Sequence, residues 1–350
     1  MAEMKNTMKA LIAYAAGDYR VEQIPMPKAN EGEIVIKVEA AGICAGDVKT
    51  FQGGGMWNGW VKAPIVPGHE FFGTIVEMGP GVKGDFKIGD RVTSEQIVPC
   101  WECKNCMSGK YWQCSRHDIY GYRLNGGMSE YMKFPKESLT HKIPKELPLE
   151  SAVLIEPFSC SKHAVDNANI GNEDIVVLSG AGALGLGMLG VIKLRNPKQV
   201  IVLDMKEYRL DLAKGFGADV VLNPAKVDVV AKVMELTDGV GCDVYIEATG
   251  YPASVIQGLA MIKKLGTFVE FGVFKEPVLV DWSIIGDFKE LKIFGSHLGP
   301  YCYEPVIEWM GNGKLPTKGV VTHKFSLDDW KQAYETAMKT DEAIKVVFIP

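Results

Sequence analysis

The sequence predicts an α/β protein of two domains, in which a strand-rich domain accompanies a doubly wound parallel sheet. Three observations lead to this prediction. The length of 350 residues suits about two domains of ~150 residues each. Short strand-like runs dominate the first part of the chain, and apolar strands alternate with amphipathic helices in the middle part.

The first part, from Lys9 to about Ile155, is expected to form strands and turns. Its β-rich runs are short and are separated by glycine and proline, as in KALIAY, EIVIKVEAAGIC, GTIVEMG and GGMSEYMKFP. Runs of this kind with few long helical periods are typical of a β domain.

The middle part, from Asp174 to about His297, is expected to form the parallel sheet. Its apolar runs follow one another at roughly 15–25 residues, the spacing of strands joined by helices: DIVVLSG, KQVIVLD, ADVVLN, CDVYIEATG, GTFVEFG and LKIFGSH. Strands that are apolar throughout are buried on both faces, so helices should cover both sides of the sheet.

The closing elements do not continue this alternation. Two helix-like segments, YEPVIEWMGNGK and SLDDWKQAYETAMK, precede a last strand, IKVVFIP. We expect them to return to the first domain. That domain would then comprise residues 1–157 and 296–350, with the parallel sheet inserted at 158–295.

Composition excludes several classes of protein. The net charge is −5 and no basic run of five or more residues occurs, which argues against nucleic acid as a partner. Apolar runs of 18 residues free of charge or glycine are absent, so no membrane span is expected. The first residues, MAEMKNTMKALIAY, lack an export signal pattern, which favours a cytoplasmic location. Eight cysteines in this compartment do not indicate a disulfide framework.

A glycine motif follows the first strand of the parallel sheet. In IVVLSGAGALGLGMLGVIKL, Gly180, Gly182 and Gly185 form the pattern G-x-G-x-x-G, with Ala183 and Leu184 inside it. Alone this pattern is weak, but here it joins a strand to a helix. The glycines would permit a tight turn and a close approach of the backbone to a pyrophosphate at the helix N-terminus. The alternative is a turn that only lets the helix pack on the sheet.

The next strand ends with an acidic residue that strengthens this interpretation. Asp204 stands nineteen residues after Gly185, where a carboxylate would accept hydrogen bonds from the adenosine ribose and repel a 2′-phosphate. The sequence therefore predicts binding of NAD in preference to NADP. Arg209 follows about one helical turn later and is included in the candidate cofactor site, although a solvated charge on a helix face is the blander interpretation.

Four cysteines gather in the segment CWECKNCMSGKYWQC. Cys100, Cys103, Cys106 and Cys114 have the spacing C-x2-C-x2-C-x7-C in a polar loop. Four thiolates at about 2.3 Å fill the tetrahedral sphere of zinc and leave no position for substrate, so such a site is structural. An iron–sulfur cluster also uses four close thiolates and stays an alternative. Either way, the chemistry has to be sought elsewhere.

Further candidate metal ligands are scattered along the chain. Cys44 lies in AAGICAGD, His69 and Glu70 in VPGHEFFG, and Glu156 in LIEPFSC. Singly, these residues are a small buried thiol, a turn histidine and acids with no special role.

Together with the glycine motif and the four-cysteine lobe at about 95–118, they resemble the zinc-dependent medium-chain alcohol dehydrogenases over the whole chain, and most of all their polyol dehydrogenase branch. The resemblance implies a GroES-like β-barrel catalytic domain and a Rossmann domain that binds NAD. It implies two zinc ions per chain. By position, Cys44, His69 and Glu156 would hold the catalytic zinc, with Glu70 as an accessory acid that holds water or binds transiently.

The implied chemistry is consistent with this ligand set. Three protein ligands leave a fourth position for water or a substrate hydroxyl. Zinc lowers the pKa of that hydroxyl, and the resulting alkoxide can release a hydride to the nicotinamide. A glutamate in place of a thiolate should leave the ion a slightly stronger Lewis acid.

The segment after Cys44 departs from the family pattern. Gly46 stands where relatives usually carry a hydroxyl, and Lys49 where they often carry histidine, so the usual route for the alcohol proton cannot start there. Asp47 matches the family's structural acid. We expect the proton to leave through water held by Glu70 or Glu156, with Lys49 near the exit; the alternative for Lys49 is an ordinary surface lysine.

A second departure is the loop FQGGGMWNGWVKAP at 51–64. Phe51, Trp57 and Trp60 could wall a substrate pocket, or they could pack locally in a glycine-rich surface loop. His297, in GSHLG, is a further candidate near the cofactor.

The sequence therefore predicts an NAD-dependent enzyme that oxidises a secondary hydroxyl of a polyol to a ketose. The aromatic residues near the site favour a short polyol. L-Threonine, 2,3-butanediol or glucose dehydrogenase activity is the alternative within the family, and a non-catalytic NAD-binding scaffold is the alternative outside it. The small-molecule polyol is the expected partner, and the resemblance implies a homodimer or homotetramer.

Overall fold

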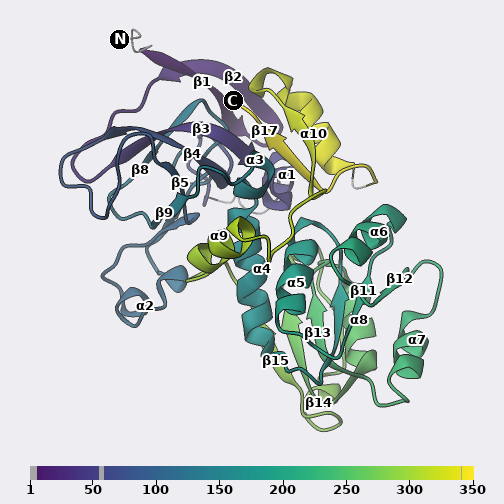
Figure 1. Ribbon diagram of the computed structural model, residues 1–350. Coiled ribbons are helices and arrows are strands. Elements are labelled where there is room, and N and C mark those ends of the chain that lie inside the picture. The colour runs from purple at the N-terminus through teal and green to yellow at the C-terminus, as the bar shows by residue number, and fades with distance from the viewer. Residues whose placement is uncertain (1–5, 55–58, 340) are drawn as a thin grey trace. The chain divides into compact units, whose positions relative to one another are not determined.

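The computed structural model describes residues 6–54, 59–339 and 341–350, and the chain divides into two compact units (Figure 1). The first unit comprises Met1–Glu156, Tyr303–Asn312 and Thr317–Pro350. The second comprises Pro157–Cys302 and Gly313–Pro316. Pro157 and residues 296–302 and 313–316, which we expected in the first domain, thus lie in the second unit.

The second unit contains the predicted parallel sheet. Its strands in sheet order are β12 (Val220–Leu222), β11 (Gln199–Leu203), β10 (Ile175–Ser179), β13 (Cys242–Glu247), β14 (Ile262–Glu270) and β15 (Lys292–Gly295). Every neighbouring pair is parallel. The order reverses between β10 and β13, and in sheets of this kind ligands bind at the carboxyl ends of the strands beside such a reversal. The predicted fold class is therefore confirmed.

Helices connect these strands. They are α4 (Ile155–Ala168), which leads into the sheet, α5 (Ala183–Leu194), α6 (Glu207–Gly215), α7 (Val229–Leu236) and α8 (Pro252–Met261), with a 3₁₀ turn at Trp282–Ile284. Right-handed crossovers place α5 and α6 on one face and α7 and α8 on the other. On the latter face Tyr245 packs on Phe268, with ring centroids 5.2 Å apart, and its hydroxyl donates to the carbonyl of Ser254 at 2.8 Å.

The first unit is built around a mixed sheet. Its strands in order are β16 (Val321–Phe325), β17 (Lys345–Phe348), β3 (Ile34–Gly42), β4 (Glu70–Met78), β5 (Arg91–Ser94) and β9 (Thr140–Ile143), and β8 (Tyr131–Phe134) also pairs with β3. Two small sheets join β1 (Thr7–Ala15) to β2 (Asp18–Pro25) and β6 (Ile97–Val98) to β7 (Asp118–Ile119). The last strand, β17, therefore pairs with β3 from near the start of the chain.

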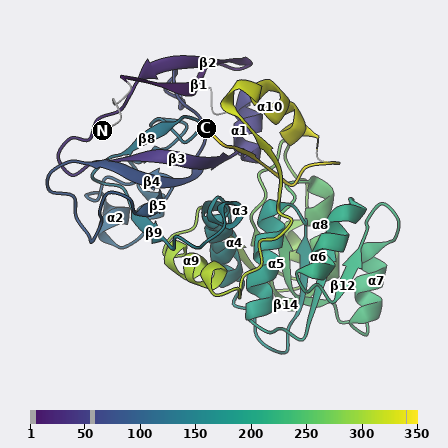
Figure 2. The same cartoon turned by 45° about the horizontal axis from the view of Figure 1, so that its top comes forward.

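Short helices complete the first unit. They are α1 (Ala45–Phe51), α2 (Lys104–Met107), α3 (Leu149–Ala152), α9 (Tyr303–Gly311) and α10 (Trp330–Met338), with 3₁₀ turns at Tyr111–Gln113 and Leu327–Asp329. Helices α1 and α10 lie side by side (Figure 2), and Phe51 packs on Tyr334 and Tyr19 at 5.2 and 5.0 Å between ring centroids. Phe51 thus takes part in local aromatic packing, as the alternative interpretation of this loop expects.

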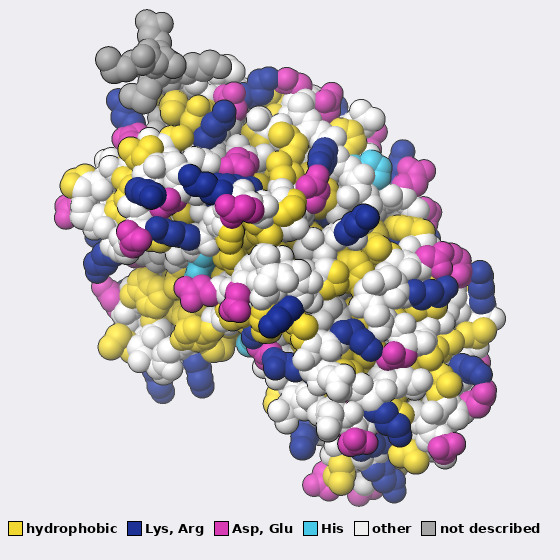
Figure 3. Space-filling view, in the orientation of Figure 1, with side chains coloured by type: hydrophobic (Ala, Val, Ile, Leu, Met, Phe, Trp, Pro, Cys, Tyr) yellow, Lys and Arg dark blue, Asp and Glu magenta, His cyan; other side chains and the backbone are white. Residues whose placement is uncertain are grey.

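The surface agrees with the composition. On the face drawn in Figure 3, basic and acidic side chains are interspersed. Within the described part of the chain, no helix combines the length and the apolar character that a membrane crossing requires.

Candidate metal centres and cofactor site

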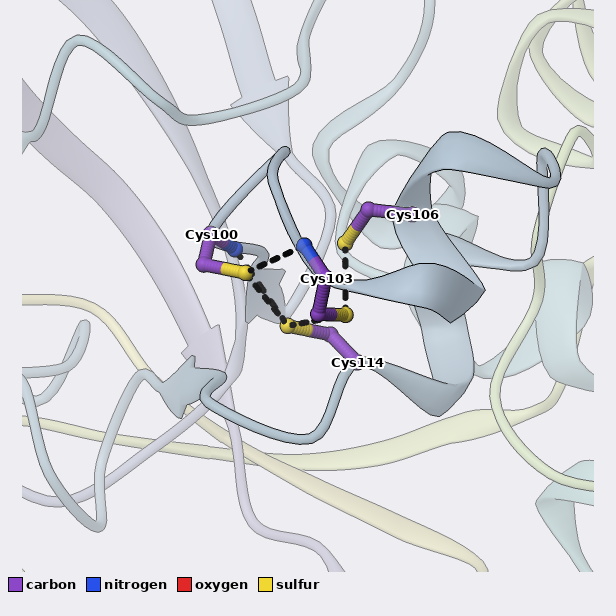
Figure 4. A group of neighbouring side chains, drawn as sticks. All are labelled: Cys100, Cys103, Cys106 and Cys114. Carbon is purple, nitrogen blue, oxygen red and sulfur yellow. Dashed lines mark hydrogen bonds between the residues drawn. The ribbon is translucent and has the colours of Figure 1, made fainter.

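The four cysteines of the loop converge on one point (Figure 4). The sulfur of Cys103 lies 3.6 Å from the Cys106 sulfur and 3.8 Å from the Cys114 sulfur. The Cys114 sulfur in turn lies 3.4 Å from the Cys100 sulfur. A tetrahedron of sulfurs around zinc has an edge of about 3.8 Å. A disulfide would need about 2.05 Å. The donor set therefore fits one tetrahedral ion with no ligand position left over.

Backbone amides prepare this loop for a cation. Amides of Cys106 and then Ser115 bond to the sulfur of Cys103 and lower the pKa of its thiol to about 5, which favours the thiolate. The loop is tied to the barrel through Tyr111, whose hydroxyl donates to both carboxylate oxygens of buried Glu95 at 3.0 Å.

A second group of candidate ligands forms in the same unit. One ligand atom each from Cys44, His69 and Glu70 lie within 4.8 Å of one another. Cys44 precedes α1 as its N-cap, and its backbone amide donates to Asp47 at 2.9 Å. His69 immediately precedes Glu70, the first residue of β4, so two of the three ligands are placed by one strand end.

The surroundings of His69 suit a metal ligand. Its Nδ1 is buried without a hydrogen-bond partner and lies 3.8 Å from Oδ1 of Asp47. A carboxylate commonly faces the ring nitrogen that does not bind the ion. Burial lowers the pKa of His69, but the charges of Asp47 and Cys44 raise it by more, so the pocket attracts positive charge. Thiolate, imidazole and carboxylate are the donors that zinc takes, and the group therefore fits zinc.

Glu70 is paired with a buried lysine. Nζ of Lys345, the first residue of β17, donates to the two carboxylate oxygens at 2.7 and 2.6 Å and to the carbonyl of Ile43 at 3.2 Å. Burial lowers the pKa of Lys345, and the charges of Glu70 and Cys44 outweigh this effect, so it stays protonated. A side chain at Gly42, opposite Glu70 in the sheet, would overlap this carboxylate.

Glu156 is not among the three residues whose ligand atoms lie within 4.8 Å of one another. Its carboxylate is buried in the first turn of α4 and accepts a hydrogen bond from the side-chain amide of Gln96. It is still near enough for its charge to raise the pKa of His69. The structure thus gathers Glu70, our expected accessory acid, with Cys44 and His69, whereas Glu156, our expected ligand, is held by Gln96.

The other candidates near this group are placed as follows. Lys49 is half-buried in the last turn of α1. Trp60 packs on Tyr122 at 5.7 Å between ring centroids, and Tyr122 stacks on His69 at 5.6 Å. Trp57 lies outside the described residues. His297 belongs to the second unit and is exposed after β15.

The glycine motif adopts the turn that a dinucleotide requires. Gly180 follows β10 with a φ of +106°, and a side chain at Gly185 would overlap the Gly180 carbonyl oxygen. Gly182 is the N-cap of α5, and Ala183 and Leu184 form its first turn. The amides at this helix start are free of a side-chain cap, as an anion-binding helix N-terminus needs.

Asp204 is fixed beside this turn. Its carboxylate accepts from the amides of Ala181 at 2.8 Å and Lys206 at 2.9 Å. The guanidinium of Arg209 lies 4.0 Å from it with only 15% of the side chain exposed, and Nε donates to the Tyr208 hydroxyl at 2.9 Å. The interpretation of Arg209 as a solvated helix charge is therefore wrong, because the side chain folds back over the turn.

Sequence reasoning missed three residues at the metal group. Lys345 carried a usable signal, since it is a charged residue opening the apolar strand KVVF. Gln96 and Tyr122 carried none, because each acts through a partner far along the chain.

Two family models match the chain. The model described as "Alcohol dehydrogenase GroES-like domain" matches residues 30–145, and "Zinc-binding dehydrogenase" matches residues 183–312.

Curated relatives match over nearly the full length. An erythritol/L-threitol dehydrogenase of Mycolicibacterium smegmatis is 43% identical over 99% of this chain and 99% of its own. A sorbitol dehydrogenase of Halalkalibacterium halodurans is 36% identical over 98% and 99%, and an L-threonine 3-dehydrogenase of Pyrococcus abyssi is 36% identical over 99% of both chains.

A solved structure agrees with these matches. The crystal structure of an alcohol dehydrogenase from E. coli CFT073 complexed with NADH has a TM-score of 0.90 at 30% identity, covering 99% of this chain and all of that one. The chain therefore belongs to the zinc-binding medium-chain dehydrogenase family and is an oxidoreductase.

Proposed function

We propose that this enzyme oxidises a secondary hydroxyl of a short polyol to a ketose, with NAD as the acceptor and one catalytic and one structural zinc per chain. The observation that carries the proposal is a pair of unequal metal groups: four cysteines that complete a tetrahedron, and three gathered donors that do not. A non-catalytic scaffold would have no need of the second group.

Zinc at the three-donor group supplies Lewis acidity toward an alcohol, and NAD supplies the acceptor for its hydride. The chain's own residues hold the donors in place. Asp47 fixes the backbone of Cys44 and faces His69, while Lys345 fixes Glu70. The sequence predicted Glu156 as the third ligand and Glu70 as the accessory acid. The proposal exchanges these two roles, with Glu156, held by Gln96, as the acid that could exchange onto the ion.

The cofactor preference rests on Asp204. A carboxylate at this position repels a 2′-phosphate and accepts from ribose hydroxyls, which favours NAD. Arg209 beside it offsets part of that repulsion. Asp204→Ala should therefore raise the ratio of kcat/KM for NADP to that for NAD, and an unchanged ratio would remove Asp204 from cofactor selection.

The substrate class follows the relative that is named for erythritol and L-threitol. Oxidation of L-threonine is a second candidate, because a threonine dehydrogenase matches as well as a sorbitol dehydrogenase does. The proposal extends to a cytoplasmic location and to a homodimer or homotetramer, and sedimentation would test the number of subunits.

A screen of NAD reduction over matched substrates tests the function. It would compare erythritol and L-threitol with xylitol, sorbitol, 2,3-butanediol, glucose and L-threonine. We expect the highest kcat/KM with a four-carbon polyol. A preference for L-threonine would move the enzyme to the second candidate. Cys44→Ser is the control that links turnover to the three-donor group. We expect this variant to fold and to bind NAD but to show no turnover.

A further inference from the structure

The space beside Cys44 is shared by two residues that are 76 positions apart, Gly46 and Tyr122. A Cβ atom built on Gly46 would stand 3.8 Å from the sulfur of Cys44 and only 3.0 Å from the hydroxyl oxygen of Tyr122. A Cβ–oxygen contact of this length is tighter than ordinary van der Waals contact, so a side chain at position 46 would need the phenol to shift by a few tenths of an ångström. The hydroxyl of Tyr122 thus borders the space into which a side chain on residue 46 would extend.

The ring of Tyr122 is held firmly at this place. It stacks on His69 with an interplanar angle of 28°, and Trp60 packs on it. Its backbone carbonyl accepts from the amide of Lys62 at 2.8 Å, and 5% of the residue is exposed. The phenol oxygen is therefore directed at the edge of the metal group by rigid neighbours.

The phenol brings a hydrogen-bonding group to this place. A phenolic hydroxyl can donate one hydrogen bond and can also accept. Within 4 Å of a Cβ atom at Gly46, the Tyr122 hydroxyl oxygen and the Cys44 sulfur are the neighbouring side-chain atoms, so the phenol is the polar group that faces this space beside Cys44.

We propose that the hydroxyl of Tyr122 forms a hydrogen bond with the substrate oxygen held at the Cys44–His69–Glu70 group and donates to that oxygen as negative charge develops on it, supplying the polar contact that Gly46 cannot make. The inference rests on the proposed function and assigns to it a substrate-binding residue. It also gives a reason for glycine at position 46, since a side chain there and the phenol oxygen compete for the same space and one of them would have to shift.

Four proteins test this competition for space: wild type, Tyr122→Phe, Gly46→Ser and the double variant. Loss of the hydroxyl in Tyr122→Phe should lower kcat/KM for the preferred polyol by about tenfold or more, since a hydrogen bond to a group with developing charge is lost. The zinc content and the Kd for NADH should not change. Gly46→Ser should unfold at lower urea than wild type, because its Cβ meets the phenol oxygen.

The double variant gives the decisive comparison. With the phenol oxygen gone, the side chain introduced by Gly46→Ser should fit. The substitution should then no longer lower the urea midpoint, and its hydroxyl should restore part of the activity that Tyr122→Phe loses. Tyr120→Phe is the matched control, since it removes a buried hydroxyl bonded to Ser138 at 2.8 Å away from the metal group. It should cost stability and leave kcat/KM unchanged.

Two results would overturn the proposal: full kcat/KM in Tyr122→Phe with both zinc ions bound, or loss of zinc in that variant, which would make the role structural. Independent effects of the two substitutions on the urea midpoint would also count against it. If no alcohol reduces NAD even with wild type, the proposed function fails instead, while the urea comparison still tests the shared volume.

Discussion

Lys345 balances the charge beside the three-donor group. Its ammonium and the carboxylate of Glu70 are both almost fully buried, so each depends on the other for compensation. Replacing one partner of such a pair lowers the free energy of unfolding far more than replacing both partners, because the remaining charge is then buried without compensation. At the scale of single residues, Lys345 therefore sets both the stability of this corner and the freedom of Glu70 to reach a metal.

Lys345→Met should lower the free energy of unfolding of the zinc-free protein by about 3 kcal/mol, the usual cost of orphaning a buried charge. It should also slow removal of the labile zinc by a chelator, because Glu70 is no longer shared. Urea denaturation and timed chelation would measure the two effects. Lys345→Arg is the control, and equal stability of the Met and Arg variants would contradict this account.

At the scale of elements, the four-cysteine loop has little regular structure of its own. It contains only α2 and one 3₁₀ turn, and helices this short are not stable alone in water. The converging sulfurs, the Tyr111–Glu95 hydrogen bonds and the bond from the Trp101 indole to the Glu137 carbonyl therefore help to hold it.

Cys103→Ser should unfold this loop and lower the zinc content from two ions to one per chain, because a structural zinc site contributes folding energy directly. Cys44→Ser should also lose one zinc but keep the melting temperature within a few degrees. Elemental analysis, circular dichroism and turnover would separate them. A Cys103→Ser protein that melts like wild type would show that the loop does not need its metal.

The side chain of Lys289, which is not part of helix α8, caps the C-terminus of that helix. Its ammonium donates to the carbonyls of Leu259, Ala260 and Ile262 at 2.7, 3.0 and 2.6 Å. Helix C-termini leave carbonyls unpaired, and a cation there also interacts favourably with the negative end of the helix dipole.

Lys289→Met should therefore destabilise the protein by about 1.5–3 kcal/mol, the range for hydrogen bonds to a charged group. Lys264→Met, at an exposed position of β14, should change the free energy of unfolding by less than about 0.5 kcal/mol. Urea denaturation of both variants decides the matter, and equal losses would argue against capping by Lys289.

At the scale of the whole molecule, each unit has its own apolar core. One core gathers residues of the barrel sheet and α10, and the other gathers residues of the parallel sheet, α7 and α8. Ligands that bind one unit should then protect that unit first.

Hydrogen exchange followed by mass spectrometry should show this separation. NADH should slow exchange in β10, α5 and β11, whereas zinc removal should speed exchange in the segment 100–114 and at the start of β4. Equal responses of both units to each ligand would mean that the molecule opens as a single cooperative unit.

The sequence predicted the features that repeat locally or stand close together. The parallel sheet followed from buried apolar runs, and the turn at Gly180 from three glycines in six residues. It could not predict partners joined only by the fold: Lys345 meets Glu70 across 275 residues, and Tyr122 meets Gly46. Arg209 was misjudged for the same reason, since its spacing resembles that of any exposed helix charge.

The distance between Glu70 and Lys345 along the chain also sets an order of events during synthesis. Glu70 leaves the ribosome 275 residues before its cation, and domains generally begin to fold while the chain is still growing. Until β17 emerges, the carboxylate next to Cys44 and His69 lacks the ammonium that compensates it in the folded protein. The charge balance of the second metal group is therefore completed long after its three donors have been made.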